Sequence, residues 1–182
     1  AATYLRGIDF IQIPTTLLAQ VDSSIGGKTG VDFDGYKNMV GAFHHPSLVY
    51  ANLSTLKTLT AEQFACGMGE VLKHGLIKNA SYYEWCINQM FEIQDREVEA
   101  LKTMVLESMK IKKAVVEKDP TEKGERALLN LGHTVGHAFE SLALAEGRPV
   151  LHGYAVAWGI VCELYLSYIK VGFPKEKMRQ TI

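Results

Sequence analysis

The spacing of apolar residues changes near residues 53–60 of this 182-residue chain, and this change limits the folds open to it. Before it, residues 8–14 alternate apolar and polar side chains, which predicts a strand, and residues 47–52 predict a second short strand. Residues 15–21 predict the beginning of a helix. After the change, apolar residues recur at helical spacing, and helices are expected at about 60–79, 81–91, 95–118, 127–144 and 152–170. A strand-bearing N-terminal part therefore precedes an all-helical body.

Residues 22–46 contain five glycines and many polar groups, so we expect a long irregular segment. Long loops inside compact domains are usually functional. The sequence DSSIGGKT ends like a phosphate loop, but Asp22 occupies the position that needs the first glycine, so the P-loop pattern fails. The segment can still form a glycine-rich anion cradle around Lys28. A flexible, solvated loop is the alternative.

Composition excludes several classes of protein. The chain is 47% hydrophobic and 21% charged, as an ordinary globular protein is. Nineteen Lys and Arg residues against twenty Asp and Glu residues argue against a nucleic-acid binder and against a polybasic membrane module. Three widely spaced cysteines without a CxxC pattern predict free thiols in a reducing compartment, hence a cytoplasmic location.

Residues 150–169 approach the length of a membrane span. They include His152 and Glu163, so a buried helix is expected and no membrane partner. The chain begins without Met and ends within an expected helix, which suggests a piece of a longer protein.

Four of the six histidines have a glycine neighbour: His74, His133, His137 and His152. Because glycine inside a helix costs roughly 1 kcal/mol relative to alanine, its repetition here indicates close approach of a ligand or of another backbone. His133 and His137 share a helix face and could serve one metal site. Thr134 stands where zinc proteases carry their catalytic Glu, so that motif is excluded. The HxxxH spacing alone is weak evidence, and two hydrogen-bonded, partly buried histidines are the alternative.

The segment GMGEVLKHG places Glu70, Lys73 and His74 on one helix face among apolar residues. A surface ion pair between Glu70 and Lys73 is the simplest explanation. A sharper one joins Glu70 to His133 and His152 from two other helices. One carboxylate and two imidazoles with open coordination positions suit a catalytic Zn²⁺.

Lys112 interrupts the apolar stripe of the helix expected at 95–118. Its side chain either reaches back to solvent or points into a site. Further along, with residues 126–130 helical, Arg126, Asn130, His133 and His137 would form one polar stripe, and a polar stripe on a packed helix needs partners. The residues therefore predict an enzyme with a metal site and a cluster of cations for an anionic, phosphorylated substrate. Balancing acidic residues are expected elsewhere.

These motifs resemble the 3-dehydroquinate synthase family of the shikimate pathway. The matching segments are RGIDFIQIPTTLLAQVDSSIGGKTGVD, YKNMVGAFHHP, GMGEVLKHGLI, EKDPTEKGERALLNLGHTVGHAFE and HGYAVAWG. They run from Arg6 to Gly159 in the family's order, and together they are highly specific.

The resemblance implies a multidomain α and β fold of the dehydroquinate synthase type. This chain would be mostly α-helical, with an N-terminal remnant of the Rossmann-like α/β domain. Residues 1–56 would end the NAD-binding domain, and residues 57–182 would form a helical metal- and substrate-binding domain that is incomplete at its C-terminus.

The resemblance also implies roles for individual residues. Metal ligands would be Glu70, His133 and His152, holding Zn²⁺ or Co²⁺. NAD contacts would come from Thr15, Thr16, Asp22, Lys28, Lys37, Thr55, Leu56, Lys57 and Thr58. Catalytic residues would be Asp22, Lys73, Lys112, Glu122, Arg126, Asn130 and His137, with Lys28 and Asn38 binding substrate. Arg6 would reach the phosphate site of a neighbouring subunit, which implies a homodimer.

The implied reaction converts 3-deoxy-D-arabino-heptulosonate 7-phosphate to 3-dehydroquinate and phosphate. It proceeds by transient oxidation, phosphate elimination, reduction and an intramolecular aldol step. Two departures stand out: Tyr154 replaces a Glu found in many members, and the chain lacks the family's glycine-rich dinucleotide loop and a late lysine. The alternatives are a related cyclase such as 2-deoxy-scyllo-inosose synthase, a metal-dependent polyol dehydrogenase, or a non-catalytic metal-binding module.

Overall fold

The computed structural model describes residues 1–34 and 36–182, and the side chains of Asp32, Tyr36 and Lys37 lie outside the description. The expected NAD contact of Lys37 therefore falls outside the described side chains.

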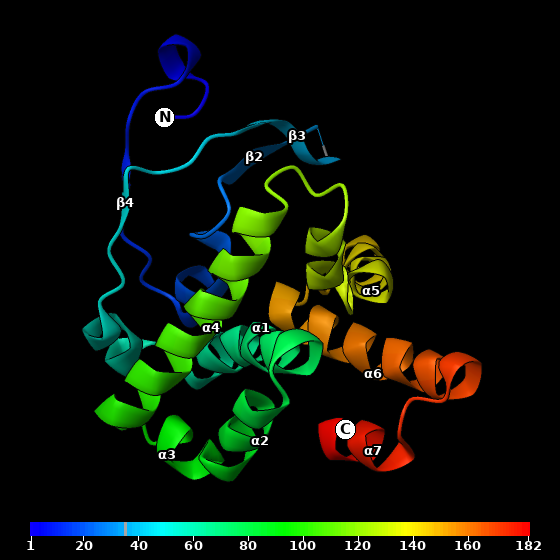
Figure 1. The fold of residues 1–182 in the computed structure, drawn as a ribbon. Helices are drawn as coiled ribbons and strands as arrows, with labels where there is room; N and C mark the ends of the chain where they lie inside the picture. The colour runs from blue at the N-terminus through cyan, green and yellow to red at the C-terminus, as the bar shows by residue number, and fades with distance from the viewer. Residues whose placement is uncertain (35) are drawn as a thin grey trace.

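A helical body carries two small sheets at one end (Figure 1). The strands are β1 (Ile11–Gln12), β2 (Lys28–Phe33), β3 (Tyr36–Phe43) and β4 (Leu48–Val49). The α-helices are α1 (Ala61–Lys78), α2 (Ala80–Asn88), α3 (Met90–Gln94), α4 (Val98–Lys118), α5 (His133–Ala145), α6 (His152–Val171) and α7 (Lys175–Thr181). Short 3₁₀ helices occur at Tyr4–Arg6, Leu53–Thr58 and Glu125–Asn130, and a π-helical turn at Ala19–Ser23.

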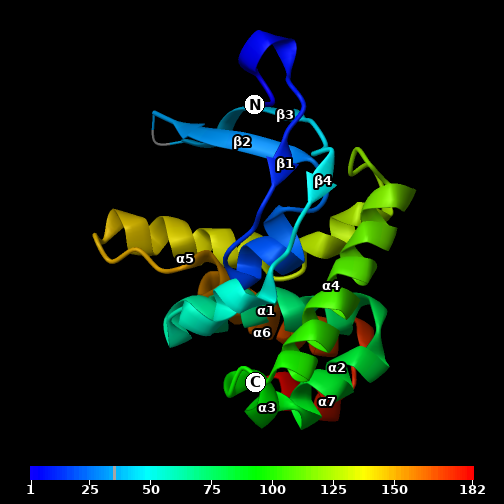
Figure 2. The ribbon, with the colours of Figure 1, turned by 90° about the vertical axis from the view of Figure 1, so that its left-hand side faces the viewer.

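The two predicted strands are present but short. β1 pairs in parallel with β4, with Ile11 opposite Leu48. The expectation that residues 22–46 are irregular is wrong, because β2 and β3 form an antiparallel hairpin in which Lys28 lies opposite Phe43. Figure 2 shows this hairpin lying above α5.

Polar residues begin the helices where the sequence places them. The Thr60 hydroxyl accepts a hydrogen bond from the Gln63 amide at 3.3 Å at the start of α1. The Asn79 side chain accepts one from the Tyr82 amide at 3.0 Å at the start of α2. Such caps satisfy amides that have no partner inside the helix. The helices expected at 60–79, 95–118 and 152–170 are confirmed as α1, α4 and α6.

The helix expected at 127–144 is wrong in its first part. Residues Glu125–Asn130 form a 3₁₀ helix, Gly132 has φ +80°, and α5 begins only at His133. The chain turns here because Glu163 of α6 accepts a hydrogen bond from the Gly132 amide at 2.7 Å. A Cβ on Gly132 would lie 2.6 Å from the Val156 carbonyl oxygen. Consequently Arg126 and Asn130 do not continue the helix face of His133 and His137.

Glycines bring α1, α5 and α6 into backbone contact. A Cβ on Gly153 would lie 1.8 Å from the Cys66 carbonyl oxygen, and one on Gly159 would lie 1.9 Å from that of Gly132. The expectation that glycines beside histidines mark the approach of another backbone is thus confirmed. Around these crossings, one apolar core joins α1, α2, α4 and the N-terminal segment, and a second joins α6 to α7.

Helix α6 is long and apolar enough, by length and composition alone, to cross a membrane. One face is buried against α1 and α5 and includes Ala155, Val156 and Ile160. The opposite face exposes Trp158 and Leu166. The expectation of a buried helix is therefore met on one face only.

Candidate metal and anion site

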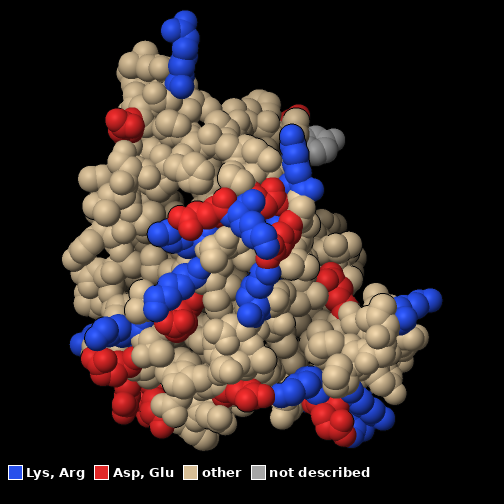
Figure 3. All heavy atoms as spheres, in the orientation of Figure 1, with Lys and Arg blue, Asp and Glu red and all other residues tan. Residues whose placement is uncertain are grey.

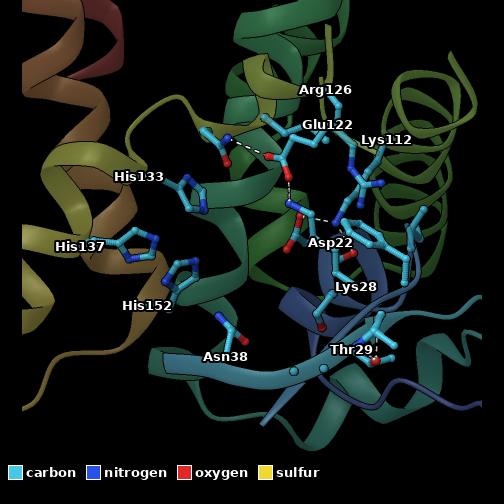
Figure 4. Close-up of a pocket in the computed structure, with 18 of the residues that line it drawn as sticks. Asp22, Lys28, Thr29, Asn38, Lys112, Glu122, Arg126, His133, His137 and His152 are labelled. Atoms are coloured by element: carbon cyan, nitrogen blue, oxygen red, sulfur yellow. Dashed lines mark hydrogen bonds and ion pairs between the residues drawn. The ribbon is translucent and has the colours of Figure 1, made fainter. Parts of the chain in front are cut away.

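A pocket of about 680 Å³ lies between the β2–β3 hairpin, α4 and the first turns of α5 and α6. Its volume is that of a typical small-ligand site. Figure 4 shows His133, His137 and His152 on one side, Lys28, Thr29 and Asn38 on the hairpin side, and Lys112 and Arg126 beyond them. The expected site residues that line it are Asp22, Lys28, Asn38, Lys73, Lys112, Glu122, Arg126, Asn130, His133, His137 and His152.

Glu70, His133 and His152 converge from three different helices. Each offers one ligand atom, and these atoms all lie within 4.8 Å of one another. The His133 Nε2 atom is 3.7 Å from Glu70 Oε1, and the rings of His133 and His152 are 5.1 Å apart between centroids. The structure therefore brings together the one carboxylate and two imidazoles that the sequence predicts as a metal site.

The proton on His133 can be located by its partner. Its Nδ1 atom lies 3.3 Å from the Leu131 carbonyl oxygen, which can only accept a hydrogen bond. Nδ1 must therefore carry the proton, which leaves a lone pair on Nε2 facing Glu70. Burial, together with nearby Lys73, lowers the pKa of His133 to about 4, so the ring is neutral at pH 7.

Glu70 is fully buried and forms an ion pair with Lys73. The pKa of Glu70 is raised to about 7, because burial and the neighbouring Asp22 carboxylate together outweigh the opposing effect of Lys73. Oε2 faces the Lys73 ammonium in that ion pair, whereas Oε1 has no hydrogen-bond partner among the residues that the structure describes. When Glu70 is ionised, Glu70 Oε1 and His133 Nε2 are both acceptors, and they face each other 3.7 Å apart. This arrangement suits a divalent cation with oxygen and nitrogen ligands.

Lys112 points into the pocket, as its position in an apolar stripe suggests. Its Nζ atom lies 2.7 Å from Asp22 Oδ1 and also donates to the Asp22 main-chain carbonyl. Burial alone would raise the pKa of Asp22, but Lys112, Lys73 and His74 outweigh burial and hold it well below its usual range. Asp22 therefore remains ionised and holds the Lys112 ammonium in place.

Glu122 links the hairpin to the 3₁₀ helix across the pocket. It forms an ion pair with Lys28 and accepts a hydrogen bond from Asn130 Nδ2 at 2.8 Å. Burial raises the pKa of Glu122, but the hydrogen bonds from Lys28 and Asn130 lower it by more. The carboxylate thus stays charged at a position where the resemblance implies a catalytic residue.

Arg126 is almost fully buried, and main-chain carbonyls hold its guanidinium. Nη1 donates to the Pro120 oxygen at 2.7 Å and Nη2 to the Gly26 oxygen at 3.0 Å. The loop before it is closed by Asp119, whose carboxylate accepts from the amides of Gly124 and Arg126. Sequence reasoning missed Asp119, although an Asp-Pro pair followed by glycine is a known signal for such a turn.

The expectation that acidic residues balance the pocket cations elsewhere is wrong. Lys28, Lys73 and Lys112 each pair with a carboxylate at the pocket itself: Glu122, Glu70 and Asp22. Figure 3 likewise shows basic and acidic side chains interleaved on the face it displays. For Lys73 and Lys112 the pairing arises because a buried ammonium without a counter-ion is costly.

Other expected site residues lie apart from the pocket lining. Arg6 is exposed in the 3₁₀ helix Tyr4–Arg6, at the N-terminal end in Figure 1. The Thr55 hydroxyl accepts from Gln20, and the Leu56 side chain is fully buried in the core. The roles of Thr15, Thr16, Thr55, Leu56, Lys57 and Thr58 in NAD binding stay predictions. Lining residues missed by sequence reasoning are Ser23, Ile25, Thr29, Gly30, Met39, Gly41, Ala42, Phe43 and Leu129.

His74 is a fully buried imidazole beside this site. Its Nδ1 atom lies 2.8 Å from the Ser108 hydroxyl, and its Nε2 atom has no hydrogen-bond partner among the described residues. Burial, together with the charge of Lys73, lowers the pKa of His74 to about 3. The ring is therefore neutral in the folded protein, whereas an unfolded-state histidine titrates near 6.5.

Acidification is expected to destabilise the fold through His74. Between pH 6.5 and 3 the unfolded chain binds a proton that the folded chain excludes, so the free energy of unfolding falls as the pH falls. From pH 7 to pH 5 this group alone removes about 2 kcal/mol. Urea unfolding at both pH values should show a smaller loss in His74→Gln than in the unaltered chain. Equal losses in the two proteins would contradict the assignment.

Two family models together cover the chain. One described as 3-dehydroquinate synthase N-terminal matches residues 1–66, and one described as 3-dehydroquinate synthase C-terminal matches residues 67–182. The 3-dehydroquinate synthase of Parabacteroides distasonis is 48% identical over 100% of this chain and 51% of its own length. That of Symbiobacterium thermophilum is 52% identical over 92% of this chain and 46% of its own length. The chain thus spans about half the length of the curated relatives it matches.

Solved structures of related cyclases share the fold. A 2-epi-5-epi-valiolone synthase from Streptomyces hygroscopicus with NAD⁺ and Zn²⁺ bound has a TM-score of 0.86 at 28% identity, and the match covers 100% of this chain and 52% of that one. A 2-deoxy-scyllo-inosose synthase complexed with carbaglucose-6-phosphate, NAD⁺ and Co²⁺ has a TM-score of 0.88 at 29% identity, covering 100% of this chain and 48% of that one. With both family models matched and near half identity across its length, the chain belongs to the 3-dehydroquinate synthase family.

Proposed function

We propose that this chain supplies the metal- and substrate-binding part of a 3-dehydroquinate synthase. The reaction is the NAD- and metal-dependent conversion of 3-deoxy-D-arabino-heptulosonate 7-phosphate to 3-dehydroquinate and phosphate. The observation that carries the proposal is the facing pair of acceptors, Glu70 Oε1 and His133 Nε2, at the edge of a pocket lined by four cationic side chains. The near half identity to curated 3-dehydroquinate synthases supports it.

Glu70, His133 and His152 would hold the metal, Zn²⁺ or Co²⁺. When bound there, the metal would supply Lewis-acid polarisation of a substrate oxygen, and NAD⁺ would supply transient acceptance of a hydride. Both solved cyclases described above contain NAD⁺ with a divalent metal, which supports this pair of cofactors.

The cations of the pocket would bind the anionic groups of the substrate. Lys28 and Lys112 reach the pocket from the hairpin and from α4, and Arg126 from the 3₁₀ helix. Guanidinium and ammonium groups form strong, charge-assisted hydrogen bonds to carboxylate and phosphate. Because Glu122 and Asp22 hold the two lysines, an incoming anion meets ammonium groups that are already positioned. Buried Arg126 adds a planar guanidinium with several N–H donors.

His137 would exchange a proton with the substrate. Its Nδ1 atom contacts Glu140 at 2.7 Å, so the proton of the neutral ring is held there and Nε2 is free on the pocket side. An imidazole with one protonated and one unprotonated nitrogen can both donate and accept a proton, and so suits proton transfer. Asn130 would donate to a substrate oxygen once its contact with Glu122 is exchanged.

Three alternative functions can be distinguished from the proposed one. A 2-deoxy-scyllo-inosose synthase or a polyol dehydrogenase acts on an uncharged polyol or a sugar phosphate without a carboxylate, and gives no use for the additional cation Arg126. Identity to the inosose synthase is 29%, well below the identity to the curated 3-dehydroquinate synthases. A non-catalytic metal-binding module would need neither the pocket nor its cations.

The test is phosphate release by the protein that contains this chain, with NAD⁺ and Zn²⁺ added. We expect phosphate from 3-deoxy-D-arabino-heptulosonate 7-phosphate and none from glucose 6-phosphate, which has a phosphate but no carboxylate. Release from both, or only from glucose 6-phosphate, would favour the related cyclase. Metal analysis of the same sample separates an inactive enzyme from a protein that binds no metal.

We also propose a homodimer in which Arg6 reaches the pocket of the neighbouring subunit. Its exposure at the N-terminal end, apart from the pocket of its own chain, supports this role. A cytoplasmic location, without a nucleic-acid or membrane partner, is proposed from the near-neutral charge and the free cysteines.

A further inference from the structure

Glu140 of α5 contacts two of the three pocket histidines at once. Its Oε2 atom lies 2.7 Å from His137 Nδ1, and its Oε1 atom lies 3.2 Å from His152 Nδ1. The side chain is 10% exposed, so water competes little for these contacts. His152 begins α6, so one carboxylate ties the middle of α5 to the first turn of α6.

The contacts determine which nitrogen of each ring carries the proton. An ionised carboxylate can only accept hydrogen bonds, so the Nδ1 atoms of His137 and His152 must donate. In a neutral imidazole the other nitrogen, Nε2, then keeps its lone pair. The Leu131 carbonyl imposes the same tautomer on His133. All three rings consequently present an unprotonated Nε2 atom.

The rings are also fixed in orientation. The His133 and His152 centroids are 5.1 Å apart at 63°, and those of His137 and His152 are 5.8 Å apart at 31°. Loss of Glu140 would free His137 and His152 to rotate and to move their protons to Nε2. A metal could then bind His152 only after the ring had been reoriented and its proton had moved back to Nδ1.

We propose that Glu140 is a positioning residue that holds His152 ready to bind the metal and His137 with Nε2 toward the pocket. The inference rests on the metal site proposed above and assigns Glu140 no contact with the metal. Outer carboxylates that hold a ligating imidazole typically change metal affinity by 10- to 100-fold. The competing assignment is direct ligation, because His137, Glu140 and His152 also offer three donor atoms within 4.8 Å of one another. The direct Nδ1 contacts to both oxygens favour the positioning role.

The test compares Zn²⁺ affinity of the unaltered chain, Glu140→Gln and Glu140→Asp by competition with a coloured chelator. Glu146→Gln is the matched control, since Glu146 lies at the end of α5 with its side chain 47% exposed and paired with Arg148. We expect Glu140→Gln to weaken Zn²⁺ binding about 10- to 100-fold, Glu140→Asp to restore part of it, and Glu146→Gln to change nothing. The absorption bands of Co²⁺ bound to Glu140→Gln should shift in wavelength but keep a similar molar absorptivity, because the ligand set is unchanged.

Equal affinity in Glu140→Gln and the unaltered chain would overturn the inference. A loss as large as that caused by removing Glu70 would overturn it in favour of direct ligation. Absence of Zn²⁺ binding by the unaltered chain would instead overturn the proposed metal site, and the inference with it. If the variants fail to fold, the unaltered chain still provides a test. ¹⁵N NMR spectra of its metal-free form should show His137 and His152 protonated at Nδ1. Protonation of His152 at Nε2 would refute the proposal.

Discussion

Replacement of Glu70 by Gln is expected to lower the affinity of the chain for Zn²⁺ by more than about 100-fold. Outer-sphere partners alone are worth 10- to 100-fold, and Glu70 is the proposed anionic ligand itself. The amide presents a weaker, neutral oxygen, and its NH₂ group would compete for the lone pair on His133 Nε2, 3.7 Å from Glu70 in the structure. Chelator competition measures the affinity.

The effect should be specific to this position. Glu62→Gln removes an exposed carboxylate from the same helix and should leave the affinity unchanged. Lys73→Met removes the partner of Glu70 but no proposed ligand, so it should retain the metal. Zn²⁺ binding by Glu70→Gln within a few-fold of the unaltered chain would place the metal elsewhere.

Replacement of Gly153 by Ala is expected to give the largest loss of stability among single methyl additions to this chain. The new Cβ would lie 1.8 Å from the Cys66 carbonyl oxygen, a backbone atom of α1 that can move only if α1 and α6 separate. Overpacking typically costs roughly 1–3 kcal/mol, and a backbone collision belongs at or above the upper end of that range. We expect Tm to fall by about 10 °C or more, or cooperative melting to be lost.

Gly124→Ala provides the matched control. It makes the same chemical change, but its Cβ would meet only Asp119 Oδ2, at an ordinary 3.7 Å. Differential scanning calorimetry of the three proteins gives the comparison. A Gly153→Ala variant that melts within about 2 °C of the unaltered chain would show that the α1–α6 crossing is looser than the structure has it.

Local sequence patterns were sufficient for the helices but not for the hairpin or for the break in the chain at Gly132. Helices α1, α4 and α6 have long stretches of apolar residues at helical spacing, so each can be placed from its own sequence. Strands β2 and β3 lack alternation and contain Gly30 and Gly41, and several apolar side chains remain exposed. The break at Gly132 depends on Glu163, a residue on another helix, and so has little local signature.

The candidate site likewise has some features that could be predicted from the sequence and others that could not. The convergence of Glu70, His133 and His152 was predictable because these residues combine the donor chemistry of a metal site with neighbouring glycines. The ion pairs were not, because Lys28 lies 94 residues from Glu122 and Lys112 lies 90 from Asp22. No periodicity relates positions so far apart, so only the folded chain shows which carboxylate meets which cation.

The glycine-mediated crossings of α1, α5 and α6 make ligand assembly and tertiary folding one thermodynamic event. Each proposed metal ligand comes from a different helix, and an unfolded chain does not bring the three together. A divalent ion that binds only the folded arrangement stabilises it by mass action, in proportion to the logarithm of its free concentration over its dissociation constant. The ion would thus act as a cross-link between distant parts of the sequence, and its supply would help to set how much of the chain is folded.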